Sequence, residues 1–172
     1  MSTFTDTFDY PGADLTQNGW TIVNGDFTTD SSRLTPDSGP LQNDISRSQP
    51  RATGVFELNG VQNSARFYGL RIAFISQTRS FRGSSNPVGY TIQFRQERRG
   101  EVFFNIRGGP KDGQRLMTLD QNHGGDPHDV RIERDPDTYE FTVYYDGERV
   151  GSVVDDTFTE SSYMALRFDG GS

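Results

Sequence analysis

The chain has 172 residues, enough for a sizeable core, and we expect a single domain over residues 1–172. Its formal net charge of −7 at pH 7 argues against generic nucleic-acid binding, because that function needs a basic surface to neutralise phosphates. The sequence has no cysteine, which excludes disulfides and thiolate metal ligands.

No apolar run approaches the roughly 20 residues that a membrane-spanning helix needs, so we expect no membrane insertion. The N-terminal residues also lack the basic start and the apolar stretch of a secretory signal. The hydrophobic fraction is low, at 31%, but 13 Phe and 7 Tyr supply large areas to bury. This composition favours a thin core between two β-sheets over a disordered chain.

Short strands are expected in the first third of the chain. Residues 20–23 and 33–35 read as the two strands of a hairpin. Residues 36–50 read as a loop, because Pro, Ser, Asp and Asn are frequent there. The next strand is expected at residues 52–58.

From residue 68 onward, apolar residues occupy every second position over several segments. This period of two is typical of strands with one face in a core. The expected core consists of Tyr68, Leu70, Ile72, Phe74, Val88, Tyr90, Ile92, Phe94, Val102, Phe104, Ile106, Met164, Leu166 and Phe168. Loops are expected at residues 78–87 and 108–113.

Residues 128–154 read as three consecutive strands. Apolar and polar residues alternate on both sides of a turn at residues 135–137, and the Asp-Gly pair at 146–147 makes a second turn. Residues 155–160 could form a short helical turn. Because no helical period is sustained anywhere, the sequence predicts an all-β fold with almost no helix.

Two parts of the sequence resemble a known superfamily. One is V-R-I-E-R-D followed by Y-E-F-T-V-Y-Y-D-G-E-R-V within residues 130–150, and the other is F-x-D-x-F-D at residues 4–9, followed by Trp20. Both are similar to the concanavalin A-like jelly rolls of laminin G-like modules, pentraxins, legume lectins and laminarinase-type glucanases. The resemblance implies a two-sheet antiparallel jelly-roll β-sandwich. These families share architecture more than chemistry.

The resemblance also implies a function, because these families bind glycans on the concave sheet or at its rim. If the even-numbered residues face the core, the opposite face carries arginines, amides and aromatic rings that can hold sugar hydroxyls and stack on sugar rings. We expect a non-catalytic glycan-binding module whose site residues are Arg95, Phe103, Asn105, Arg107 and Tyr144. Charged side chains that only pair across strands are the alternative explanation of such a face.

A bound cation is a further expectation, because hard cations take carboxylate and carbonyl oxygens and the chain is rich in Asp. The resemblance implies a structural calcium ion at Asp169, near the C-terminal strand, and a turn at Asp169-Gly170 that ends this strand is the alternative explanation. His123 and His128, together with Asp126 or Asp129, could instead ligate a transition metal. A glycine-rich loop that leads into a strand explains that histidine segment as well.

A glycan-cleaving enzyme is a third possibility. A retaining glucanase needs two carboxylates about 5 Å apart, and the resembled enzymes carry their acids on one strand as Glu-x-Asp-x-x-Glu or Glu-x-Asp-x-Glu. Glu133, Asp135 and Asp137 are superficially similar. Pro136 interrupts the strand ladder, however, so both Asp residues are expected in a turn. We therefore do not expect an enzyme.

The alternative to glycan recognition is a structural role in a virion, as a phage capsid decoration or tail attachment protein that contacts other subunits. A self-contained length without cysteine or signal peptide favours this alternative. In either case the expected location is extracellular or on a virion surface.

Overall fold

A computed structural model describes residues 6, 8, 10, 14–30, 33–36, 42–61, 67–79, 81, 88–95, 102–119, 121 and 126–170. The described residues form strands β1 to β13 and one short 3-10 helix, η2. Their bounds are β1 Trp20–Asn24, β2 Phe27–Asp30, β3 Arg33–Pro36, β4 Gln42–Ser48, β5 Gly54–Val61, β6 Phe67–Ser76, β7 Gly89–Arg95, β8 Val102–Arg107, η2 Gly109–Lys111, β9 Arg115–Leu119, β10 His128–Arg134, β11 Glu140–Tyr145, β12 Glu148–Val154 and β13 Tyr163–Gly170.

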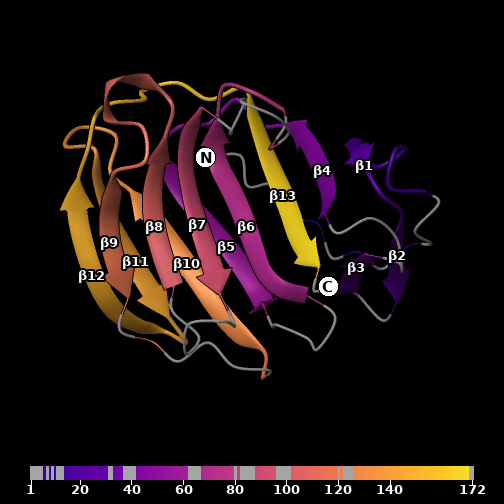
Figure 1. The fold of residues 1–172 in the computed structure, drawn as a ribbon. Helices are drawn as coiled ribbons and strands as arrows, with labels where there is room; N and C mark the ends of the chain where they lie inside the picture. The colour runs from indigo at the N-terminus through magenta and orange to yellow at the C-terminus, as the bar shows by residue number, and fades with distance from the viewer. Residues whose placement is uncertain are drawn as a thin grey trace.

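The strands form two large sheets, which Figure 1 shows stacked as two layers with β10 and β5 behind β7 and β6. The larger sheet has seven strands in the order β1-β4-β13-β6-β7-β8-β9, and the smaller has four in the order β12-β11-β10-β5. Neighbouring strands in both sheets are antiparallel. Strands β2 and β3 form a separate hairpin sheet. The predicted antiparallel two-sheet sandwich with almost no helix is confirmed.

The core lies between the two large sheets. Phe74, Tyr90 and Phe104 from the larger sheet meet Phe141 from β11, with ring centroids 4.7 to 6.1 Å from the Phe141 ring. Such separations are typical of aromatic pairs in protein cores. The alternating positions predicted for the core are buried or pack against it, and only the side chain of Tyr68 lies outside the described part of the structure.

One charged side chain points into this core. Arg134 follows Val130 and Ile132 on the inward face of β10 and is 1% exposed. Its guanidinium donates to the carbonyls of Ala52 and Phe158, at 2.8 and 2.7 Å, and to other acceptors around it. The guanidinium carbon lies 4.6 Å from the centre of the Phe141 ring. Hydrogen bonds and aromatic faces together replace the water that a buried cation loses.

Asp155 completes this buried cluster. Its carboxylate accepts hydrogen bonds from the Tyr90 hydroxyl and from Lys111, both at 2.6 Å. Although burial by itself raises the pKa of Asp155, hydrogen bonds from Lys111, Tyr90 and Thr157 lower it to about 2. The cluster therefore ties η2 and the segment after β12 to the core.

Three expectations about local structure are wrong. Residues 20–23 and 33–35 are strands but do not form a hairpin with each other, because β1 pairs with β4 and β3 pairs with β2. The loop predicted at residues 36–50 contains strand β4, whose Gln42–Ser48 segment has Ile45 as its one apolar residue and pairs with both β1 and β13. Tertiary pairing outweighs the weak strand propensity of such a segment. The helical turn at residues 155–160 does not form, because Asp155 instead accepts the N–H of Thr157 at 2.9 Å within the buried cluster.

The opening motif, predicted from residues 4–9, is described only at Asp6 and Phe8. Asp6 accepts hydrogen bonds from Trp20 Nε1 at 2.6 Å and from the Tyr10 hydroxyl at 2.8 Å, and Phe8 packs 5.7 Å from the Trp20 ring. These contacts join the described part of the N-terminal segment to β1. No helix in the described part of the chain is long and apolar enough to cross a membrane.

Candidate functional site

The outer face of the seven-stranded sheet carries polar side chains that are almost inaccessible to water. Tyr90, Ile92 and Phe94 of β7 face the core, so Thr91 and Gln93 face outward, and each is only 4% exposed. A polar group that is shielded from water needs a hydrogen-bonding partner. Such burial is unusual on the non-core side of a sheet and marks this face as a candidate site.

Strand register arranges these outward residues in two rows across the sheet. One row runs Asp44, Arg167, Arg71, Gln93 and Phe103 across β4, β13, β6, β7 and β8. The second row runs Ser46, Ala165, Ala73, Thr91 and Asn105 across the same five strands. The first row is charged at the β4 end, whereas the second row has small side chains through its middle.

Two ion pairs hold the charged end of the face. Arg167 donates from Nε and Nη2 to the two carboxylate oxygens of Asp44, at 2.7 and 2.9 Å. Both residues are nearly buried, at 4% and 1% exposure. Arg71 Nε lies 2.8 Å from Asp169 Oδ2, and burial raises the pKa of Asp169 against the opposing effect of Arg71 and Arg167. Each of these two ion pairs is neutral as a unit, and Arg107 lies outward at the end of β8 on the same face.

Phe81 covers part of the second row. It belongs to the connection between β6 and β7, is 3% exposed, and packs against Ala73 and Ala165. The Arg167 guanidinium carbon lies 5.2 Å from the centre of the Phe81 ring. Small side chains at two neighbouring positions therefore leave room for one ring from a loop, which also holds Arg167 in place.

The predicted site residues do not share one surface, so that expectation is wrong. Asn105 lies in the second row and is 6% exposed, and Arg107 ends β8 half-buried. Arg95 ends β7 and Phe103 lies in β8, but their side chains fall outside the described part of the structure. Tyr144 lies in β11, where Val143 and Tyr145 face the core. It therefore points outward from the other sheet, on the opposite side of the sandwich.

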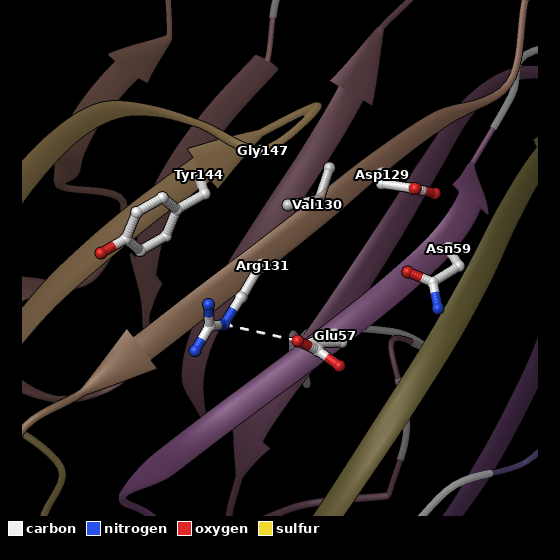
Figure 2. A pocket seen from close by; sticks show the side chains of 7 residues that line it. All are labelled: Glu57, Asn59, Asp129, Val130, Arg131, Tyr144 and Gly147. Atoms are coloured by element: carbon white, nitrogen blue, oxygen red, sulfur yellow. Dashed lines mark ion pairs between the residues drawn. The ribbon is translucent and has the colours of Figure 1, made fainter.

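Tyr144 borders an open pocket of about 270 Å³ on the outer face of the four-stranded sheet. Figure 2 shows the Tyr144 ring, the Arg131 guanidinium and the Glu57 carboxylate in a row. Arg131 Nε lies 3.4 Å from Glu57 Oε1, and the same guanidinium pairs with Glu133. The pocket is lined by Glu57, Asn59, Asp129, Val130, Arg131, Tyr144 and Gly147.

The surroundings of Asp169 disfavour the predicted calcium ion. Its carboxylate faces the Arg71 guanidinium, and the charge of Arg167 also acts on it. A divalent cation there would meet two positive charges. No group of three acidic or histidine side chains suited to a metal ion occurs among the described residues. His128 Nδ1 instead lies 2.8 Å from Asp146 Oδ2, and His123 falls outside the described residues.

The acids considered for catalysis do not form a pair. Asp135 accepts hydrogen bonds from the N–H groups of Thr138 and Asp137, at 2.8 and 2.9 Å, which lowers its pKa. It is therefore a turn residue, as Pro136 predicted. Glu133 lies within β10 and pairs with Arg131 on the outer face of the smaller sheet.

Sequence reasoning missed Asp44, Arg167 and Phe81 as members of the face. Arg167 lies between Leu166 and Phe168, two residues predicted for the core, so alternation alone could have placed it outward. Asp44 lies in a strand that was read as a loop. Phe81 carries no local signal, because a loop aromatic that packs on a sheet is decided by tertiary contacts.

No protein-family model matches the chain, and no curated protein sequence matches it. Solved structures do. The carbohydrate-binding module CBM66 from Bacillus subtilis is 17% identical with a TM-score of 0.67, over 88% of this chain and 89% of that one. The β-glucanase of Bacillus licheniformis is 12% identical with a TM-score of 0.64, over 98% and 86%. The potassium-bound carbohydrate recognition domain of Emp46p is 14% identical with a TM-score of 0.66, over 96% and 88%.

Proposed function

We propose that this chain, which has the concanavalin A-like jelly-roll fold, is a non-catalytic module that binds carbohydrate on the outer face of its seven-stranded sheet. The observation that carries the proposal is the pair of polar rows on that face, with side chains already fixed by ion pairs and packing. Fixed polar groups bind a ligand without the entropy cost of ordering them first.

The chemistry of the rows suits sugar hydroxyls. Gln93 and Asn105 are 4% and 6% exposed, so a sugar must displace the cover of this face, of which Phe81 is a part, to reach them. Each amide then offers both a donor and an acceptor to neighbouring hydroxyls. Arg71 is more exposed than Arg167 and sits beside Gln93 in the first row. Because both arginines of the two rows are already paired with carboxylates, we expect a neutral glycan rather than a uronate or a sialylated one.

Two of the three similar structures support this proposal. One is a carbohydrate-binding module and one a carbohydrate recognition domain, which supports binding, and the third is a glucanase. On this face Asp44 and Asp169 are each paired with an arginine. Arg167 holds both oxygens of Asp44 and Arg71 holds Oδ2 of Asp169, which leaves less of either carboxylate to meet a substrate. We therefore propose binding without hydrolysis.

The test is a glycan array followed by calorimetric titration of the tightest neutral oligosaccharide. We expect Gln93→Ala and Asn105→Ala each to weaken binding about ten-fold, the loss that corresponds to about 1.4 kcal/mol. Gln114→Ala is the matched control, because Gln114 is an exposed amide before β9 that belongs to neither row. A blank array, or wild-type affinity in both row variants, would remove the proposal.

A parallel assay separates binding from catalysis. The protein is incubated with a β-1,3-1,4-glucan, and released reducing ends are measured in buffer with calcium and again with chelator. We expect no release above background in either buffer. Turnover that disappears in Asp169→Asn would overturn the non-catalytic assignment. A structural role in a virion and a location outside the cell stay predictions from the sequence.

A further inference from the structure

The outer face of the four-stranded sheet holds a pocket that the proposed function does not use. Its lining comes from β5, β10 and β11 and from the turn at Gly147, so it is assembled by the sheet itself. Glu57, Arg131 and Tyr144 are direct register neighbours across these three strands. We infer that this pocket is a second carbohydrate site, for a neutral sugar. The inference rests on the proposed function for its class of ligand but not for its location.

An aromatic ring with a fixed orientation forms one wall. Tyr144 is half-buried, and the Arg131 guanidinium carbon lies 5.5 Å from the ring centre. Its hydroxyl donates to Glu133 at 3.4 Å. Contacts at both the ring and the hydroxyl limit its rotation, so the ring offers a stable apolar surface to the C–H side of a sugar.

The other walls supply donors and acceptors for hydroxyl groups. Asn59 is exposed at the rim, where its amide can both donate and accept. Asp129 is positioned by the N–H of Gly60, which donates to Asp129 Oδ1 at 2.8 Å. Glu57 stands on the far side of Arg131 from Tyr144 (Figure 2). A ring with neighbouring hydroxyls can thus meet an aromatic surface and several polar groups at once.

The balance of charge disfavours an anionic ligand. Two carboxylates, Glu57 and Asp129, line the pocket with one guanidinium, Arg131. Arg131 is already paired with Glu57 and with Glu133. An anionic sugar would therefore meet repulsion without a spare cation to offset it. A cationic sugar could also stack on Tyr144, so the test includes one as a comparison.

The two proposed sites lie on opposite sides of the core, because each is on the outer face of a different sheet. A single chain would then hold two sugars that point away from each other. Such a chain can bridge two polysaccharide strands, which a one-site module cannot do.

The test is a titration followed by ¹H–¹⁵N correlation spectra of the full chain. The probes are six neutral sugars: D-glucose, D-galactose, D-mannose, D-fructose, L-fucose and N-acetyl-D-glucosamine. D-Glucosamine and D-glucuronate serve as cationic and anionic comparisons. We expect at least one neutral sugar to shift the amides of residues 129–131 and 144–147 saturably, with a Kd on the order of millimolar.

Variants assign the shifts to the pocket. Tyr144→Ala and Glu57→Gln should each weaken this binding about ten-fold while the melting temperature stays near that of the wild type. Arg149→Ala is the matched control, because Arg149 faces Tyr144 in the register of β12 but does not line the pocket. Binding by glucosamine alone, abolished in 0.5 M NaCl, would replace the inference with a cation site.

The same spectra keep the two sites apart. Shifts confined to residues 44–48, 91–93 and 165–169 would leave the proposed function standing and overturn the second site. Shifts confined to the pocket would do the reverse. Wild-type affinity in Tyr144→Ala and Glu57→Gln would also overturn the second site, whatever the other face does.

Discussion

The two outer faces of the sandwich carry the same kind of ion pair in different surroundings. On the seven-stranded sheet, the Asp44 and Arg167 side chains are 1% and 5% exposed and joined by two hydrogen bonds. On the four-stranded sheet, the Glu57 and Arg131 side chains are 56% and 46% exposed and 3.4 Å apart. Acid and arginine are register neighbours across adjacent strands in both cases.

The difference shows that residue type and register do not set the energetic role of a pair. Water screens the exposed pair, so it adds little to stability. The buried pair has lost its water, and each partner now depends on the other for its hydrogen bonds. The first face is therefore rigid and sensitive to substitution, whereas the second can change its contacts when a ligand arrives.

The largest expected effect is the loss of the buried pair. Arg167→Ala should lower the free energy of unfolding by about 3–5 kcal/mol, because it leaves Asp44 charged and buried without its partner. Urea denaturation at pH 7 measures this loss. The Asp44→Asn, Arg167→Met double variant should recover part of it, since neither position then holds a charge. If Arg167→Ala lowers the free energy of unfolding by less than about 1 kcal/mol, water screens the Asp44–Arg167 pair as it screens the exposed pair on the other face.

The cover over the first face gives the next effect. Phe81→Ala should cost about 3 kcal/mol, because it exposes Ala73 and Ala165 and removes the ring beside Arg167. Val154→Ala on β12 is the comparison, since Val154 is 63% exposed and should change stability by about 0.5 kcal/mol or less. Thermal denaturation of both variants measures the difference. Similar melting temperatures would show that Phe81 adds nothing to the face.

Asp155 belongs to neither face and tests whether burial alone makes the difference. Its folded pKa of about 2 is below the unfolded value near 3.9, so its contribution is present above about pH 4 and is lost as the pH falls towards 2. We expect about 1 kcal/mol, a discounted figure because Lys111 is partly in water.

Denaturant unfolding between pH 5 and pH 2 measures this contribution. In Asp155→Asn the acid-dependent part should be missing, so the stability difference between wild type and variant shrinks as the pH falls. If the difference in unfolding free energy between wild type and Asp155→Asn stays constant from pH 5 to pH 2, the ionisation of Asp155 does not contribute to the stability of the cluster.

The smallest effect is expected at the exposed pair. Arg131→Ala should change the free energy of unfolding by about 0–1 kcal/mol, and 1 M NaCl should reduce that difference further. Urea denaturation at low and high salt measures both quantities. If Arg131→Ala lowers the free energy of unfolding as much as Arg167→Ala does, the exposed pair stabilises the fold as strongly as the buried pair, and the proposed difference between the two faces is wrong.

Much of the fold was readable from alternation. Ile92, Phe94 and Phe104 were expected in the core and are buried there, because a period of two can place apolar side chains together only on one face of a strand. The segment Gln42–Ser48 shows where this reasoning stops. With one apolar residue it has no pattern, and its strand exists because β1 and β13 pair with it on both sides.

The candidate sites were readable only in part. Asn105 and Tyr144 both lie outward, as alternation predicts, but alternation does not say which sheet a strand joins. Arg134 shows a second limit of prediction from sequence. Alternation along β10 places its side chain inward, whereas its charge would predict an exposed position. It is stable inside only because distant carbonyls and aromatic rings surround it.

The sequence by itself determined the all-β class, the strands of residues 128–154 and the core-facing side of the strands that show alternation. These are local consequences of side-chain period and turn chemistry. Only the tertiary structure decided that the outward residues divide between two opposite faces, one partly covered by Phe81 and one with an open pocket at Tyr144. The reason is that sheet membership and loop packing depend on contacts between residues far apart in the chain, which no local pattern records.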